Sequence, residues 1–330
     1  MASKGCWTHP EGLRYFQSVN GEMPAPMAAG VATNECLVCG AECPQWVALR
    51  TPHGEFRIVR CGGCGFAFVN PRPTAEFLTD FYSNSGHGGS EPKSLERVLR
   101  AEQDYPNSTL DAQRLVANIH RFCGNEPYGG QLRLLDIGCG YGFFSRQAKV
   151  SGFEVTALEV ASEEYSIAAQ VAGLTPVRVS FEEFDGQDEC FSALLMSQIL
   201  EHALDVNLWI AKAYRLLKPS GVLAIALPNF GSLFRLVMQE KEPYICPPAH
   251  LNFFTIRSLS LLLERHGFHV VKTHSISRMD PSVILRRVPF SRVIGRGGAR
   301  FAFRCCFAPL DSVGLGTMIN LYAQKPAEDR

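Results

Sequence analysis

From residue 132 onward, short apolar runs alternate with segments whose apolar positions recur at helical spacing. The apolar runs predict strands at residues 132–138, 154–160, 175–184, 190–202, 222–229, 268–277 and 317–326. Helices are expected between them at residues 142–152, 162–173, 204–221 and 258–267. Strands that alternate with helices are typical of a doubly wound parallel sheet, which binds ligands at the carboxyl ends of its strands. We therefore predict an α/β fold with a seven-stranded, mostly parallel sheet of the Rossmann-like kind.

The pattern upstream of residue 132 divides into three parts. Residues 1–33 are rich in Gly, Pro, Ala and Asn without a sustained period, which predicts a loose N-terminal arm. Residues 74–122 read as a helical linker or lid that is interrupted near Pro106. Residues 34–73 form a compact cysteine-containing unit, and the large α/β domain is expected to span residues 123–330.

The compact unit carries two C-x-x-C-G knuckles, one at Cys36 and Cys39 and the other at Cys61 and Cys64. Thiolates three residues apart on a tight turn can reach one tetrahedral ion, and two such pairs make a four-cysteine zinc ribbon. One pair alone would also suit a redox function, but two pairs at this spacing favour zinc. A site with four thiolates has no open position, so the metal is expected to be structural. The nearby Cys43 is more typical of a packed thiol than of a ligand.

Composition narrows the function classes. The formal net charge is zero, so overall charge points to neither a nucleic acid nor a membrane surface. No apolar stretch reaches the length of a membrane span, and the N-terminal residues lack the apolar core of a signal peptide. With twelve cysteines and no export signal, we expect a reducing cytoplasm, in which cysteines serve as ligands or free thiols.

The first predicted strand leads into the sequence LLDIGCGYG, whose glycines are Gly138, Gly140 and Gly142. Such a turn between a strand and a helix lets a ligand approach the backbone beside unpaired N–H groups. A dinucleotide fingerprint would place its third glycine at position 143, which is Phe143 here. Glu159 closes the second strand, where a carboxylate can accept hydrogen bonds from ribose hydroxyls. The pattern predicts a nucleotide-type cofactor site.

These segments, LLDIGCGYGFFS, ALEVAS, ILEHALD and LLKPSGVLAIALPN, resemble the class I S-adenosylmethionine-dependent methyltransferases over about residues 108–325. The later segment PPAHLNFFTIRSLSLLLERHGF is similar to a bacterial branch with an N-terminal four-cysteine zinc ribbon and a Pro-Arg-Pro segment. Several members of that branch act in antibiotic, modified-sugar or cell-surface polysaccharide pathways. The resemblance implies S-adenosyl-L-methionine as methyl donor and structural zinc as the bound metal.

The resemblance also implies a cofactor-binding set: Asp136, Gly138, Cys139, Gly140, Glu159, Phe181, Glu182, Ser197 and Gln198. The first four would hold the methionine end of the cofactor, and Glu159 would bind the ribose hydroxyls. Phe181 and Glu182 are the candidates for adenine, although Glu183 and Asp185 compete for that role. Ser197 and Gln198 would face the methyl donor or serve as ordinary loop residues.

Three residues are candidates for the acceptor side, the part of the site that would bind the methyl acceptor: His250, His202 and Tyr244. Methyl transfer to a hydroxyl or an acidic C–H group needs a general base, and imidazole is suited to that role near neutral pH. His250 lies in the loop after the fifth strand, and His202 follows the tip of the fourth. His202 also has the interpretation of support for the cofactor loop, and Tyr244 is expected to line the pocket.

Arginines recur between the last two predicted strands, within residues 279–311: Arg286, Arg287, Arg292, Arg296, Arg300 and Arg304. The insertion is either a solvated helical face or a lid that contacts an anionic acceptor or a membrane surface.

The sequence favours a methyltransferase acting on a small-molecule intermediate in natural-product or modified-sugar biosynthesis. Oxygen is a slightly better candidate acceptor atom than carbon or nitrogen, because a histidine base suits it. One alternative is an RNA methyltransferase that grips RNA through the ribbon, but the charges of residues 36–70 are nearly balanced. The other is a non-catalytic zinc-ribbon interaction protein, against which the intact Asp136, glycines and Glu159 argue. Nucleic acid is therefore not the expected partner, and the oligomeric state is open.

Overall fold

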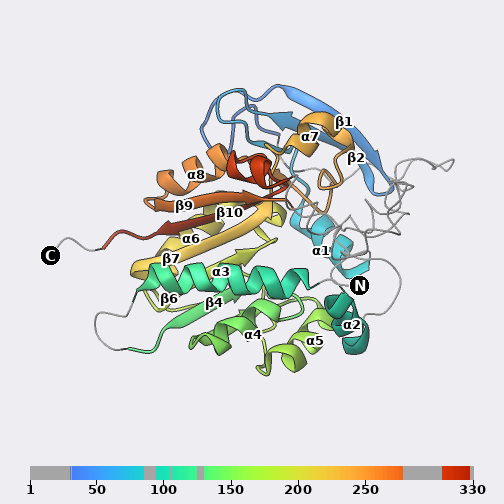
Figure 1. Ribbon diagram of the computed structural model, residues 1–330. Coiled ribbons are helices and arrows are strands. Elements are labelled where there is room, and N and C mark those ends of the chain that lie inside the picture. The colour runs from blue at the N-terminus through green and yellow to red at the C-terminus, as the bar shows by residue number, and fades with distance from the viewer. Residues whose placement is uncertain are drawn as a thin grey trace.

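The computed structural model describes residues 30, 32–84, 94–104, 106–124, 130–277 and 307–327 (Figure 1). The predicted N-terminal arm therefore lies almost entirely outside the described residues, as does most of the arginine-rich insertion at 279–311.

A six-stranded sheet forms the centre of the molecule, in the order β5-β4-β6-β7-β10-β9 (Figure 1). Its strands are β4 (Arg133–Ile137), β5 (Glu154–Leu158), β6 (Phe191–Ser197), β7 (Leu217–Pro228), β9 (His269–Ile276) and β10 (Met318–Gln324). The β5-β4, β4-β6 and β6-β7 pairs are parallel, and β10 runs antiparallel to both of its neighbours. The mostly parallel α/β sheet is thus confirmed, and the carboxyl ends of β4, β5, β6 and β7 meet at one edge.

The expected seventh strand, at residues 175–184, contributes only one bridge. Val177 pairs in parallel with Leu158 at the outer edge of β5, and the residues that follow turn away. This single bridge places the segment next to β5. It stays short because Val177 is exposed at an edge and gains little burial from longer pairing.

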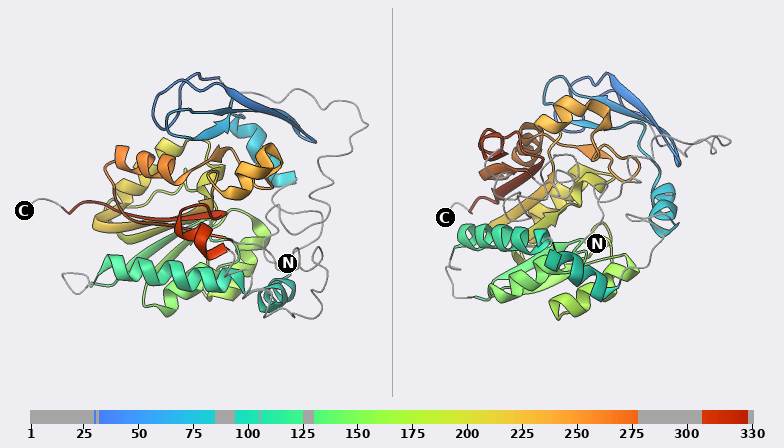
Figure 2. Two further views of the ribbon diagram at one scale, coloured as in Figure 1. Left: turned by 45° about the horizontal axis from the view of Figure 1, so that its top comes forward. Right: turned by 45° about the vertical axis from the view of Figure 1, so that its right-hand side comes forward.

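Helices cover both faces of the sheet (Figures 1 and 2). One face carries α3 (Asn107–Cys123), α4 (Phe143–Val150) and α5 (Ser162–Ala172), and the other carries α6 (Val206–Leu216) and α8 (Ile256–Arg265). The α6 helix begins where Asp205 accepts hydrogen bonds from the N–H groups of its first turn, and α8 begins with a capping box at Thr255. The two helices of this second face therefore start at side-chain caps, whereas α3, α4 and α5 on the first face have no side-chain cap hydrogen bond.

The segment before the sheet is helical, as expected for residues 74–122. It forms α1 (Ala75–Asn84), α2 (Leu95–Asp104) and α3, and the break near Pro106 falls between the last two. Leu115 and Ile119 of α3 are fully buried against the sheet, whereas Leu110 is exposed.

The cysteine-containing unit is a small antiparallel sheet at the top of the view in Figure 1. It comprises β1 (Gln45–Thr51), β2 (Gly54–Arg60) and β3 (Ala67–Val69), and its fourth strand is β8 (Asn252–Phe253) from the large domain. Phe66 and Phe68 pack in the same hydrophobic cluster as the buried face of α8. The ribbon is thus continuous with the segment that follows His250.

Within the part of the chain that the structure describes, no helix is both long and apolar enough to cross a membrane.

Candidate functional site

The glycine loop joins β4 to α4 at the carboxyl edge of the sheet. Gly138, Gly140 and Gly142 all have positive φ, the left-handed region that favours glycine. A Cβ atom added at Gly140 would meet no described heavy atom within 4 Å, whereas one at Gly142 would lie 3.1 Å from the backbone of Ala168 on α5. Gly140 therefore faces open space in which a ligand can approach the backbone, and Gly142 allows α4 and α5 to pack closely.

Two buried acids support this loop. Asp136, on β4, accepts a 2.6 Å hydrogen bond from the Ser145 hydroxyl, and burial raises its pKa to about 6. Glu159 follows β5 and accepts hydrogen bonds from the N–H of Gly140 at 2.8 Å and of Ala161 at 2.9 Å. Burial also raises the pKa of Glu159, although the two N–H donors oppose that effect. The carboxylate of Glu159 thus links the ends of β4 and β5.

The neighbouring strand β6 ends at the same edge, at Ser197. Gln198, which follows, has a φ of 56° and donates its N–H to the Ala226 carbonyl at 2.6 Å. A non-glycine residue in this conformation is uncommon and is often found at ligand sites. The structure therefore brings Asp136, the glycine loop, Glu159, Ser197 and Gln198 to one edge of the sheet, as their positions in the sequence predict.

The two adenine candidates follow the Val177 bridge and lie against α6. Phe181 is buried with its ring edge-on to Trp209, at 5.1 Å between centroids. The Glu182 carboxylate accepts a 2.7 Å hydrogen bond from the Trp209 indole, and its backbone carbonyl accepts one from Lys212. Both residues are thus engaged with α6, and their contact with adenine stays a prediction.

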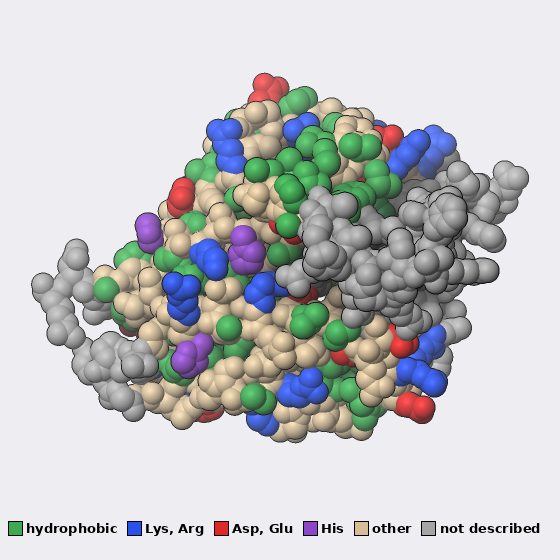
Figure 3. Space-filling model, in the orientation of Figure 1, with side chains coloured by type: hydrophobic (Ala, Val, Ile, Leu, Met, Phe, Trp, Pro, Cys, Tyr) green, Lys and Arg blue, Asp and Glu red, His purple; other side chains and the backbone are tan. Residues whose placement is uncertain are grey.

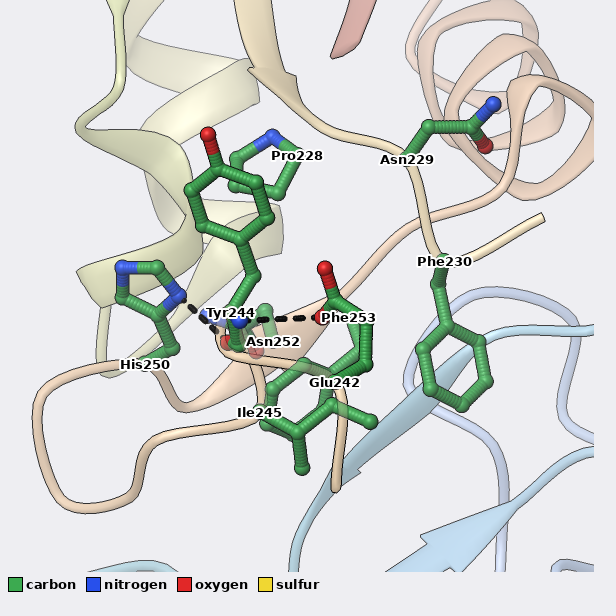
Figure 4. A pocket seen from close by; sticks show the side chains of 9 residues that line it. All are labelled: Pro228, Asn229, Phe230, Glu242, Tyr244, Ile245, His250, Asn252 and Phe253. Carbon is green, nitrogen blue, oxygen red and sulfur yellow. Dashed lines mark hydrogen bonds between the residues drawn. The ribbon is translucent and has the colours of Figure 1, made fainter. Parts of the chain in front are cut away.

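The two candidate histidines lie together, with ring centroids 4.8 Å apart. His202 ends a short 3₁₀ turn (Leu200–His202) after β6, and its Nδ1 lies 2.6 Å from the Ala249 carbonyl. The Nδ1 of His250 lies 2.8 Å from the Tyr244 carbonyl (Figure 4). A carbonyl only accepts, so each Nδ1 carries the proton and each Nε2 is the nitrogen that can accept one.

Burial sets the charge state of this cluster. Burial and the neighbouring His202 lower the pKa of His250 to about 3, so its ring is neutral near pH 7. Glu201 is 2% exposed, and burial raises the pKa of its carboxyl group to about 8. Among the described residues, neither carboxyl oxygen of Glu201 has a hydrogen-bond partner. Glu201, His202 and His250 each bring one donor atom within 4.8 Å of the others, a carboxylate and imidazole set that divalent metals also bind.

A small cavity lies beside His250 (Figure 4). Its volume is about 10 Å³, which is about enough for one water molecule. Tyr244 lines the cavity, and its ring stacks on that of His250 at 6.2 Å between centroids. On the outer side, the Tyr82 hydroxyl of α1 donates to the Ala249 carbonyl at 3.3 Å. The linker helix therefore touches the loop that carries His250.

The four knuckle cysteines meet in the ribbon. Their sulfur atoms lie within 4.8 Å of one another, with Cys36 and Cys64 3.5 Å apart and Cys39 and Cys61 3.4 Å apart. A tetrahedral zinc ion with ~2.3 Å bonds to sulfur would place its ligands at similar separations. Cys43 is buried nearby but its thiol is directed to the Ala41 carbonyl, outside this set. The donor set therefore fits zinc.

Reasoning from the sequence missed three residues near the histidines: Arg72, Glu201 and Asn252. Arg72 and Asn252 both donate side-chain hydrogen bonds to the Ala203 carbonyl, although 180 residues separate them in the chain. Arg72 is part of the Pro-Arg-Pro segment and Glu201 directly precedes His202. Their roles were missed because a local sequence pattern does not reveal contacts between residues so far apart in the chain.

Comparison with known proteins agrees with this geometry. A family profile described as a methyltransferase domain matches residues 108–273, which is half of the chain. The chain belongs to this methyltransferase family. The matched residues include the glycine loop, Glu159, Ser197 and both histidines, and the domain is of the class I S-adenosylmethionine-dependent type.

Among curated proteins, the methyltransferase is similar to the mitochondrial ubiquinone biosynthesis O-methyltransferase of Mus musculus, with 29% identity over 160 residues. That match covers 44% of this chain and 43% of the mouse protein. A ubiquinone biosynthesis O-methyltransferase of Mesorhizobium japonicum is 30% identical over 108 residues, covering 31% of this chain and 43% of that one. The chain thus spans less than half the length of these relatives.

Among solved structures, a methyltransferase of Archaeoglobus fulgidus aligns with a TM-score of 0.49 and 21% identity, over 69% of this chain and 99% of that chain. A possible histamine N-methyltransferase of Thermotoga maritima aligns with a TM-score of 0.46 and 18% identity, over 70% of this chain and 97% of that one.

Proposed function

We propose that the protein transfers the methyl group of S-adenosylmethionine to a hydroxyl oxygen of a small biosynthetic intermediate. The observation that carries this proposal is the edge formed by β4, β5 and β6. The open space at Gly140 and the buried Asp136 and Glu159 lie at this edge, and the turn that follows β6 there carries His202, whose ring packs beside that of His250. A donor site and a basic acceptor site thus share one edge.

The donor side is built from the glycine loop and its two acids. The N–H groups of Cys139, Gly140 and Gly142 are already hydrogen-bonded, so N–H groups at the start of α4 would bind the methionine carboxylate, and Asp136 would bind its ammonium group. Glu159 retains acceptor capacity beyond the two N–H bonds, because a carboxylate offers about four lone-pair sites. It would therefore accept from the ribose hydroxyls without releasing the loop.

On the acceptor side, we assign the proton-accepting role to His202. When bound, S-adenosylmethionine supplies a sulfonium methyl whose S–C bond breaks as the acceptor's O–C bond forms. The acceptor hydroxyl's proton would pass to Nε2 of His202, since Nδ1 is held by the Ala249 carbonyl. Burial lowers the pKa of His250 to about 3, which makes it a poor base, so it would orient the acceptor beside its neighbour. Tyr244 would support His250 through its carbonyl.

The acceptor itself is proposed only by class. Relatives named as O-methyltransferases of ubiquinone biosynthesis support oxygen over carbon or nitrogen. Natural-product or sugar biosynthesis and a cytoplasmic location stay predictions. An anionic acceptor also stays a prediction, because the arginines of the 279–311 insertion that suggested it lie outside the described residues. On the face drawn in Figure 3, Lys and Arg side chains are scattered and form no continuous patch among the described residues, which does not favour RNA.

We also propose that Cys36, Cys39, Cys61 and Cys64 bind zinc in a purely structural site. A closed set of four thiolates leaves no position for a water or an acceptor. The metal would stabilise a ribbon that has a small core of its own.

The test combines calorimetry with a screen that detects S-adenosylhomocysteine release from phenols, catechols, sugars and transfer RNA. We expect S-adenosylmethionine to bind and one hydroxyl compound to be methylated. His202→Ala should abolish turnover while leaving cofactor binding intact, and His250→Ala should retain part of it. Methylation of RNA alone would contradict the proposal, and cofactor binding without any turnover would favour the non-catalytic alternative. Unchanged turnover in His202→Ala would exclude it as the base.

A further inference from the structure

The two segments that carry the histidines are tied directly to each other. The Leu251 N–H donates to the Glu201 carbonyl at 2.8 Å, and the Asn252 side-chain amide donates to the Ala203 carbonyl at 2.7 Å. These bonds join residues adjacent to His202 with residues adjacent to His250. The relative position of the two rings is therefore fixed by the backbone around them.

A single arginine from the ribbon side spans both segments. Arg72, which follows β3, donates from Nη2 to the carbonyls of Ala203 at 2.8 Å and Leu204 at 2.7 Å. Its Nη1 donates to the Leu251 carbonyl at 3.0 Å, and its Nε to the Leu204 carbonyl at 3.2 Å. All three carbonyls belong to residues that come just after a histidine. A planar guanidinium can hold several carbonyls in this fork geometry, which the single ammonium of lysine cannot reproduce.

The ribbon reaches the same place through its backbone. β3 pairs with β8, and the Val69 N–H donates to the Leu251 carbonyl at 3.0 Å. The knuckles themselves contact the large domain, since the Thr255 hydroxyl donates to the Cys64 carbonyl and the Asn207 amide donates to the Leu37 carbonyl. Hydrogen bonds from β3 and Arg72 therefore hold the residues that come just after each histidine, and the knuckles are bonded separately to α6 and α8 of the large domain.

We propose that Arg72 is a positioning residue, through which the cysteine-containing ribbon sets the geometry of the His202 and His250 pair. The ribbon thereby acts as a support for the acceptor side of the site and not as a separate binding module. This inference rests on the proposed function only in treating these two histidines as acceptor-side groups.

The contacts separate this role from general stabilisation of the fold. Among the residues that the structure describes, Arg72 makes its four side-chain bonds to residues 203, 204 and 251, and the cofactor loop at Gly138–Gly142 is held by other residues. The loss of Arg72 should therefore disturb the histidines and leave the methyl-donor site unchanged. Burial lowers the pKa of Arg72 to about 10, so the guanidinium remains charged at neutral pH.

The experiment compares the full-length wild type with Arg72→Met, Arg72→Lys and the control Arg57→Met. Arg57 lies on β2 of the same ribbon, and its exposed side chain forms an ion pair with Glu55. Three readouts are taken from each variant. Long-range ¹H–¹⁵N spectra report the protonated nitrogen of each histidine ring, calorimetry reports S-adenosylmethionine affinity, and cobalt absorption reports the four-thiolate site.

We expect wild-type His202 and His250 to show protonated Nδ1, and Arg72→Met to lose that pattern in both rings. In Arg72→Met we expect no change in the signal of His120 on α3, in the cofactor affinity or in the cobalt spectrum. The histidine spectra of Arg72→Lys should be intermediate between those of the wild type and Arg72→Met. Once an acceptor is found, turnover of Arg72→Met should fall by about tenfold or more at unchanged KM for the cofactor, because catalysis is sensitive to misplacement.

Unchanged His202 and His250 signals in a folded Arg72→Met would overturn the proposal. So would parallel loss of cofactor binding, cobalt site and histidine pattern, which would make Arg72 a general structural residue. If Arg72→Met does not fold, Arg72→Lys decides between these outcomes. None of these three readouts needs an acceptor, so a failure here is distinct from the absence of methyl transfer in the wild type.

Discussion

Replacing Asp136 with asparagine should stabilise the cofactor-free protein while weakening its affinity for S-adenosylmethionine. Asp136 is 1% exposed, and burial raises its pKa from 3.8 to about 6. A raised pKa means that folding favours the protonated carboxyl group. The contribution of Asp136 to the free energy of unfolding is therefore fully present below about pH 4 and is lost as the pH rises through 6. At 1.36 kcal/mol per pKa unit, the charged group costs about 3 kcal/mol at pH 8.

Asparagine carries no charge, and its side-chain carbonyl can still accept the hydrogen bond from the Ser145 hydroxyl, so this cost disappears in the variant. Urea unfolding of both proteins should show Asp136→Asn gaining about 1.4 kcal/mol relative to the wild type between pH 5 and pH 8. The gain arises because the wild type alone loses stability over that range. Calorimetry should show weaker cofactor binding, since the variant lacks the carboxylate that would pair with the methionine ammonium.

Two results would refute this reasoning. A stability difference that stays flat from pH 5 to pH 8 would show that burial does not hold the Asp136 carboxyl protonated. Unchanged cofactor affinity in Asp136→Asn would show that its charge does not contribute to the donor site.

Three further predictions concern the framework of the site. Leu115→Ala on α3 should lower the free energy of unfolding by about 2–5 kcal/mol, because that side chain is fully buried. Leu110→Ala, at a position 54% exposed on the same helix, should change it by less than about 0.5 kcal/mol. Equal effects of the two substitutions in urea titrations would contradict this packing. Gly142→Ala should destabilise the protein by about 1–2 kcal/mol, because φ is +79° and the added Cβ would press on the backbone of Ala168, and an unchanged melting temperature would argue against that approach. Removal of zinc with a chelator should increase hydrogen exchange in β1, β2 and β3 while cofactor binding persists; loss of activity with unchanged exchange would contradict a structural metal.

The sequence predicted the parts of the fold that depend on local pattern. Apolar runs placed the strands of the sheet, and Pro106 marked the break between α2 and α3, because a proline and the residue before it disfavour a continuing helix. The glycine loop and Glu159 were predictable since parallel strands bring their carboxyl ends to one edge. The knuckle spacing likewise predicted the cysteine cluster, because four thiolates at that spacing can converge.

The remaining features depend on contacts between distant residues. The pairing of β3 with β8 joins residues that are more than 180 positions apart, and two-residue strands carry no periodicity of their own. Arg72 reads as part of a turn until its partners are known. The expected strand at residues 175–184 was too long because edge exposure, which periodicity does not report, decided its extent.

The central claim is that S-adenosylmethionine binds at the carboxyl edge of β4 and β5. A titration of ¹⁵N-labelled protein with S-adenosylmethionine, followed by backbone amide shifts, tests it most directly. The account predicts saturable shifts centred on Gly138, Gly140 and Glu159, with little change in β1 and β2 of the ribbon. An absence of saturable shifts, or shifts confined to the ribbon, would contradict it.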